Sequence, residues 1–182
     1  MMTLIEGKRL LDSNNIPFSE LRFKNTADYW LYKNPLANTE KVDKNPVTLL
    51  VVSSNNQKKN IELLFADENN DGNDTFIDLY FGQYFYDLFE EEDFDCEEDL
   101  QQTIVNEINR VMKNDIIVVA KEVRKKAVFH MLAFYDKKEN IPGIENMMKE
   151  INKKKGLFAK LFGPKTQYEI YDWNSYQCIV KG

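Results

Sequence analysis

The stretch VTLLVVSSNNQKKNIELLFA, residues 47–66, decides the fold class. It opens with an apolar, β-branched run over residues 47–53 and passes through a polar turn into a second apolar run over residues 60–66. Such side chains fit the half-buried, pleated surface of a sheet. Two runs of this kind joined by a short polar turn predict a β-hairpin.

A third strand is expected directly after this hairpin. Residues 67–74 are rich in Asn, Asp and Gly, which is typical of a turn. Residues 75–81 then form another apolar run with alternation, and Gly82 interrupts it as a bulge or bend. Three consecutive strands with short connections predict an antiparallel meander at the centre of the chain.

Helices are expected on both sides of the meander. Leu100, Ile104, Ile108 and Val111 recur at helical spacing, and Asp95 could cap this helix, with Glu98 three residues later completing a capping box. A second main helix is predicted from Pro142 to about residue 155, and a short N-terminal helix over residues 4–11.

The remaining segments complete an α+β class. Further strands are predicted at residues 18–23, 115–123 and 127–135, and the chain ends in a predicted hairpin of residues 168–173 and 176–180. Residues 26–33 fit either a short helix or an irregular aromatic segment. We therefore expect a mostly antiparallel sheet, built from the central meander and the C-terminal hairpin, packed with two main helices and a short N-terminal helix. The prediction is one domain over residues 1–182, with a surface loop at about 34–46.

Charge and composition narrow the classes of function. The chain carries a net charge of −6, but residues 1–113 hold 11 basic and 22 acidic residues, whereas residues 114–182 hold 13 basic and 8 acidic ones. An acidic chain is a poor nucleic-acid binder. No apolar run reaches the ~18 residues that span a bilayer, and the start does not resemble a signal peptide. Cys96 and Cys178 are far apart, which favours free thiols and the cytoplasm.

The most unusual segment is acidic and follows aromatic residues. Residues 87–99 contain nine carboxylates and no basic residue. The helix dipole explains the carboxylates near the start of the predicted helix, because negative groups are stabilised at that end. The carboxylates at 90–93 have no such explanation, and they belong either to a solvated loop or to a docking surface. The predicted partner-binding residues are Tyr84, Tyr86, Phe89, Glu90, Glu91, Glu92 and Asp93. The expected partner is a basic protein, as for an antidote or immunity-type protein, and a homodimer stays open.

No other pattern predicts a specific chemistry. Residues 67–78 resemble a calcium loop in spacing, but the expected strands on both sides favour a polar turn. His130 is the only histidine, and a pairing with Cys96 or Cys178 has no supporting motif. We therefore predict no catalytic residue, cofactor or metal ligand, and a non-enzymatic role is favoured. The alternatives are a small hydrolase or transferase that uses carboxylates or a Cys/His pair, and a small-ligand-binding protein.

Overall fold

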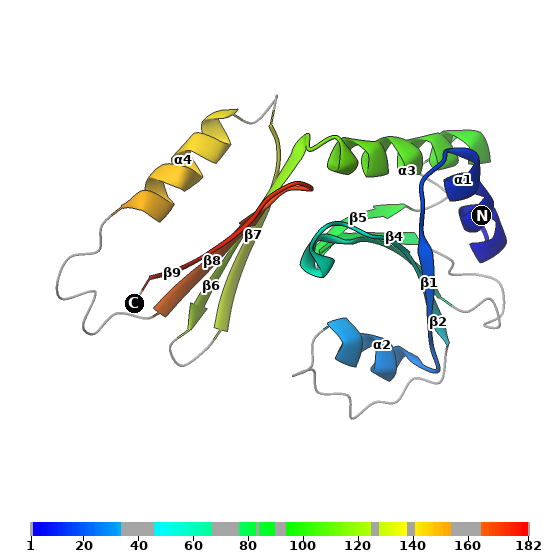
Figure 1. Ribbon diagram of the computed structural model, residues 1–182, viewed down its shortest axis with the longest axis horizontal. Helices are drawn as coiled ribbons and strands as arrows, with labels where there is room; N and C mark the ends of the chain where they lie inside the picture. Colours follow the sequence, from blue (N-terminus) through cyan, green and yellow to red (C-terminus); the bar gives the residue numbers. More distant parts are fainter. Residues whose placement is uncertain are drawn as a thin grey trace. The chain divides into compact units, whose positions relative to one another are not determined.

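The computed structural model describes residues 2–33, 46–66, 77–82, 84–89, 94–124, 128–137, 141–153 and 165–181. By its internal packing the chain divides into two compact units, Met1–Ile108 and Asn109–Gly182, and each contains its own sheet (Figure 1). Compactness does not establish independent folding, so the single domain stays a prediction. The loop expected at about 34–46 lies outside the described residues except for Pro46.

The first unit contains a five-stranded antiparallel sheet, sheet A, in the order β1-β2-β3-β4-β5. Its strands are β1 (Ser19–Phe23), β2 (Val47–Val52), β3 (Ile61–Ala66), β4 (Ile77–Phe81) and β5 (Tyr84–Phe89). The predicted meander is therefore confirmed as β2-β3-β4, and the sheet continues by one strand on each side. The fold class, α+β with antiparallel sheets, is confirmed as well.

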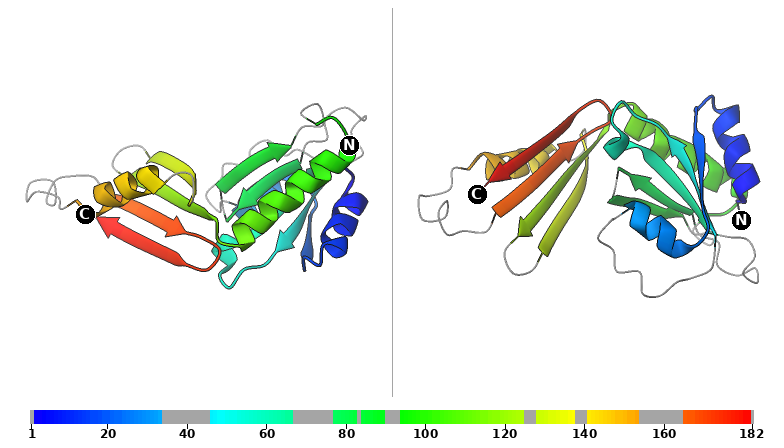
Figure 2. Two further views of the ribbon diagram at one scale, coloured as in Figure 1. Left: turned by 90° about the horizontal axis from the view of Figure 1, so that it is seen from above. Right: turned by 60° about the horizontal axis from the view of Figure 1, so that its bottom comes forward.

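Three α-helices accompany sheet A, together with a short 3-10 helix, η1 (Gln57–Lys59). They are α1 (Leu4–Ser13), α2 (Thr26–Lys33) and α3 (Glu97–Met112). Figures 1 and 2 show α1 and α3 over one face of the sheet and α2 over the other. Residues 26–33 thus form a helix, at whose start the Asp28 amide donates to Asn25 Oδ1 at 2.9 Å. A side-chain acceptor before the first turn gives a hydrogen bond to a backbone amide that has no acceptor within the helix.

Helix α3 begins two residues later than the predicted cap at Asp95. The first backbone bond of the helix runs from the Leu100 amide to the Cys96 carbonyl at 3.3 Å, so Cys96 rather than Asp95 occupies the N-cap position. Sequence alone favours aspartate over cysteine at such a position. The carboxylates of the first turn, Glu97, Glu98 and Asp99, still lie at the positive end of the helix dipole as expected.

The two faces of sheet A bury different sets of side chains. On the α2 face, Tyr29 of the helix packs with residues of three strands in one core cluster: Val47, Leu49, Val51, Leu64 and Tyr80. Successive residues of a strand point to opposite faces, so Phe65 points to the face that α1 covers. A Cβ added at Gly7 of α1 would lie 2.5 Å from the Phe65 ring, which shows how closely this helix approaches the sheet.

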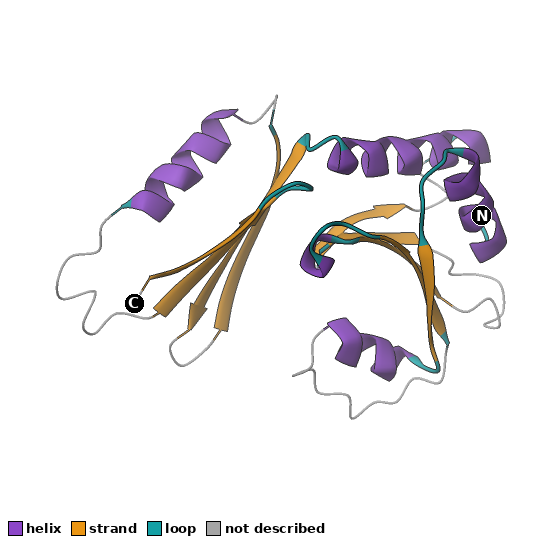
Figure 3. Ribbon diagram, viewed as in Figure 1, coloured by secondary structure: helices purple, strands orange, loops and turns teal. Residues whose placement is uncertain are grey.

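The second unit contains a four-stranded antiparallel sheet, sheet B, in the order β7-β6-β8-β9 (Figure 3). Its elements are β6 (Ile116–Arg124), β7 (Val128–Asp136), α4 (Ile141–Asn152), β8 (Lys165–Tyr171) and β9 (Tyr176–Lys181). Strands β8 and β9 confirm the predicted C-terminal hairpin. Ile151 of α4 packs with Val119, Tyr168 and Ile170 of the sheet.

None of the helices in the described ranges is both long enough and apolar enough to cross a bilayer.

Candidate functional site

Strand β5 forms one edge of sheet A. It pairs with β4 on one side, and within the described residues no strand pairs with its other side. The pairing register shifts between Leu79 and Tyr80, so that Tyr86 falls at a bulge between Phe85 and Asp87, which oppose Tyr80 and Leu79. An edge strand presents backbone N–H and C=O groups that a further strand can use. We call this outer side of residues 84–89 the β5 edge.

The structure separates the predicted partner-binding residues into two groups. Tyr84, Tyr86 and Phe89 belong to β5, at the edge of the sheet. Glu90, Glu91, Glu92 and Asp93 lie outside the described residues, immediately after that strand in the sequence. Sequence reasoning missed the strand itself, although the aromatic run of residues 84–89 has a high β-propensity that could have indicated it.

A second group of polar side chains was not predicted at all. It lies on the α2 face of sheet A and comprises three tyrosines, one lysine and two carboxylates, which we call the α2-face cluster: Tyr29, Tyr32, Lys33, Glu62, Asp78 and Tyr80. The sequence contains a feature that could have indicated this cluster, because Glu62 and Asp78 are each a carboxylate within an otherwise apolar strand. Buried polar groups of this kind are uncommon and require partners.

Lys33 and Glu62 form the best-satisfied part of this cluster. The Lys33 ammonium donates to Glu62 Oε2 at 2.7 Å and to the Gly82 carbonyl at 3.1 Å. It also lies 4.3 Å from the centre of the Tyr80 ring. The second oxygen of Glu62 accepts from the Tyr32 hydroxyl at 3.1 Å. The ammonium is thus held by a carboxylate, a carbonyl and an aromatic face, which are its three usual kinds of partner.

Burial dominates the electrostatics around this ion pair. The Lys33 and Glu62 side chains are only 7% and 5% exposed. Burial lowers the pKa of Lys33, and the attraction of Glu62 opposes that change. Burial also raises the pKa of Tyr32 and of Tyr80 to about 12, so these phenols stay protonated at neutral pH. The tyrosines therefore act here as hydrogen-bond groups and not as bases.

Asp78 differs from Glu62 in having no cationic partner among the described residues. Its carboxylate accepts one hydrogen bond, from the Tyr80 hydroxyl at 3.2 Å, and no lysine or arginine in the described ranges forms an ion pair with it. The residue is half-buried, and this burial raises its pKa while the Tyr80 hydrogen bond opposes the shift. A carboxylate in such surroundings favours the arrival of a positive group.

Tyr29 supplies the third polar group of interest. Its side chain is 1% exposed, and its hydroxyl makes no hydrogen bond of normal geometry in the part of the chain that the structure describes, although it lies beside the Tyr80 hydroxyl. Burial raises the pKa of Tyr29 well above its ordinary value, and a hydrogen-bonding interaction with Tyr80 and the charges of Glu62 and Asp78 raise it further. The hydroxyl therefore faces these groups. A buried hydroxyl without a partner costs about 1–3 kcal/mol.

The raised pKa of Asp78 leads to a test of stability against pH. A carboxyl whose pKa is raised by folding stabilises the protein when protonated, and this contribution is lost as the pH rises through its folded pKa. Asp78→Asn keeps an oxygen that accepts from Tyr80 but carries no charge. At pH 7 we expect this variant to be more stable than the wild type by up to about 1 kcal/mol, after screening by solvent, and the difference should vanish near pH 3.

Urea unfolding at the two pH values measures this difference. Asp12→Asn on the exposed side of α1 is the matched control and should change stability little at either pH. A loss of stability in Asp78→Asn at pH 7 would show that the ionised carboxylate is well satisfied in the fold.

Within sheet B, the structure places His130 and Cys178 apart. Cys96 and Cys178 are exposed free thiols. His130 lies on β7 and Cys178 on β9, which are opposite edges of sheet B with two strands between them, a separation of roughly 14 Å. Residues 67–76 of the calcium-loop pattern lie outside the described residues, and Asp78 lies within β4. Within the described ranges, no group of three or more possible ligands could hold a metal ion.

Comparison of the chain with protein-family models, with curated proteins and with solved structures found no match.

Proposed function

We propose that this chain is a non-enzymatic binding module in which the β5 edge pairs with an extended segment of a basic protein partner. The observation that supports it is the position of β5 as the outer strand of sheet A, followed at once in the sequence by the acidic residues 90–93. Strand addition of this kind gains affinity from main-chain hydrogen bonds. The carboxylates after the strand would attract the partner and set its orientation.

The composition of β5 supports an edge that is open to a partner. Natural edge strands are commonly protected against pairing by lysine, by proline or by a bulge. Residues 84–89 contain neither lysine nor proline, although the bulge at Tyr86 is a feature of this kind. They contain aromatic residues, which are enriched at protein interfaces. Strand β7 is also an edge strand without lysine or proline, but Lys137 and Lys138 follow it closely, which does not suit a basic partner.

An antidote or immunity-type protein is the concrete form of this proposal. Such a protein would cover a basic surface of a toxin domain and prevent its action. The net charge of −11 over residues 1–113 supports attraction to a basic surface. Fold and charge describe a class of binding protein here, and the partner itself has to be found by experiment.

Charge reversal tests the proposal with a matched control. The test variant replaces the four carboxylates at 90–93 by lysine, and the control variant makes the same change of net charge in the exposed residues around the start of α3, Asp95, Glu97, Glu98 and Asp99. Both variants and the wild type are used to capture partners from the native host. We expect the test variant to retain less than about a tenth of the capture, equivalent to 1.4 kcal/mol or more, and the control to retain most of it.

Two outcomes would contradict this function. Equal losses in the two variants would mean that net charge alone attracts the partner, and unchanged capture by the test variant would mean that residues 90–93 take no part. Sedimentation of the chain alone shows whether a second copy occupies the edge, because self-pairing would give a dimer without any partner.

A further inference from the structure

The start of strand β5 is joined to sheet A by a short ladder. The pairing of β5 with β4 shifts register between Leu79 and Tyr80, and a bulge of this kind interrupts the ladder. On the turn side of the bulge, the paired residues are Tyr80 with Phe85 and Phe81 with Tyr84. A short two-stranded segment is weak by itself, so the order of this part of the β5 edge depends on the turn that precedes it.

The turn between β4 and β5 is fixed through both polar groups of the Gly82 backbone. Gly82 belongs to the two-residue connection between these strands, and its φ of 67° suits a tight hairpin loop. Its amide donates to the Asn60 carbonyl at 2.8 Å, and its carbonyl accepts from the Lys33 ammonium at 3.1 Å. The turn is thus tied on one side to the residue that precedes β3 and on the other to the last residue of α2.

Lys33 contacts both this turn and the strand pair beside it. Its ammonium lies 4.3 Å from the centre of the Tyr80 ring, and Tyr80 is the residue that opposes Phe85 of β5. The ammonium is held in place by Glu62 at 2.7 Å, within a nearly enclosed ion pair. A hydrogen bond from a charged donor is about twice as strong as one between neutral groups. One side chain of α2 therefore stabilises the turn and the ladder that follows it.

We propose that Lys33 is a positioning residue for the β5 edge. By holding the Gly82 carbonyl and the Tyr80 ring, it keeps the turn and the first residues of β5 in the sheet, so that the outward amides of this edge are in place before a partner strand arrives. Preorganisation of this kind lowers the ordering cost of binding. The consequence for binding rests on the proposed function of the β5 edge, whereas the ordering of the strand is a property of the free chain.

Residue-resolved amide hydrogen exchange of the free chain tests this role. The test variant combines Lys33→Met with Glu62→Leu, which removes the bond to the Gly82 carbonyl without leaving a buried charge unpaired. We expect the Gly82 amide and the β5 amides that pair with β4 to exchange at least about tenfold faster than in the wild type, while the paired amides of β1 and β2 change by less than about threefold. The resonance of the Gly82 carbonyl carbon should also move upfield, because this carbonyl loses a charged donor.

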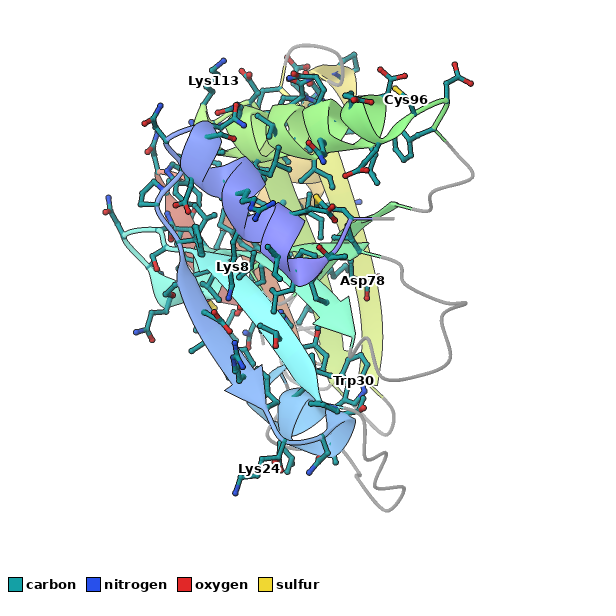
Figure 4. All side chains as sticks on the ribbon, turned by 90° about the vertical axis from the view of Figure 1, so that its right-hand side faces the viewer. Lys8, Lys24, Trp30, Asp78, Cys96 and Lys113 are labelled. Atoms are coloured by element: carbon teal, nitrogen blue, oxygen red, sulfur yellow. The ribbon has the colours of Figure 1, made fainter. Side chains whose placement is uncertain are left out.

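Two controls separate the contact with the turn from the loss of an ion pair as such. Lys8→Met removes the ion pair between α1 and β1, at the lysine labelled in Figure 4, and should leave exchange in β5 as in the wild type. Glu62→Gln keeps Lys33 and an oxygen beside it, so exchange in β5 and in β1 should change alike. The role of Lys33 is refuted if the double variant exchanges equally faster in β5 and in β1, or if its β5 amides are unaffected.

These outcomes are independent of the proposed function, because no partner is present in the exchange experiment. Charge reversal at residues 90–93 tests the docking surface, and a failure there would leave the ordering of β5 by Lys33 intact. Unchanged exchange in the double variant would remove the role of Lys33 and leave the docking surface to be decided by capture of the partner.

Discussion

Replacing Lys33 by methionine is expected to lower the free energy of unfolding by about 3–5 kcal/mol. The reason is the state in which Glu62 would be left. Its carboxylate is only 5% exposed and receives 2.7 Å and 3.1 Å hydrogen bonds from Lys33 and Tyr32. Methionine fills a similar volume but supplies no charge, so an uncompensated carboxylate would stay buried in the α2-face cluster. Urea unfolding at pH 7 gives the loss directly.

The double variant Lys33→Met with Glu62→Leu separates charge from packing. An apolar pair of similar volume often equals or exceeds a buried ion pair in stability, so we expect the double variant to recover most of the loss. Lys8→Met is the control, since Lys8 and Glu20 form an ion pair with side chains 29% and 24% exposed. That change should cost less than about 1 kcal/mol. A loss of the same small size in Lys33→Met would show that Glu62 reaches water in the folded protein.

Truncation of Tyr29 to alanine is expected to have a similar effect, with a loss of about 3–5 kcal/mol. The ring fills the space between α2 and sheet A, where it packs with Val47, Leu49 and other residues of the core cluster. It also meets the Phe23 ring edge to face, with the ring centres 5.8 Å apart. Alanine would leave a cavity in this layer, and thermal or urea unfolding would report its cost.

Tyr29→Phe is the matched control because it keeps the ring and removes only the hydroxyl. A hydroxyl that is buried without a partner contributes no stability, so its removal should change the free energy of unfolding by less than about 1 kcal/mol, with a gain in stability as the favoured sign. A loss above about 2 kcal/mol would mean that the hydroxyl makes a strong hydrogen bond in the folded protein.

Local patterns predicted most of the secondary structure. The apolar runs of β2 and β3 and the helical spacing within α3 are properties of neighbouring residues, and they appear in the structure where they were expected. The distribution of strands over two sheets could not be predicted, because β6 pairs with both β7 and β8 through contacts between distant segments. Strand pairing of this kind depends on tertiary contacts.

The candidate sites were predictable to different extents. The acidic and aromatic segment was visible because its residues are neighbours in the sequence, but the position of its residues 84–89 at a sheet edge depends on the order of strands. The α2-face cluster was not visible because Lys33 and Glu62 are separated by 29 residues. Only an unusual local feature, a carboxylate within each of two apolar strands, marked Glu62 and Asp78 as residues that need partners.

Amide hydrogen exchange of the chain, alone and with its captured partner, tests the binding function most directly. Pairing of a partner strand with the β5 edge would engage the outward amides of residues 84–89, which are free of strand pairing in the described structure. We predict that exchange in this segment slows at least tenfold in the complex, equivalent to about 1.4 kcal/mol of added protection, while β1 at the other edge is unchanged. Protection that appears elsewhere and leaves β5 unaffected would contradict the account.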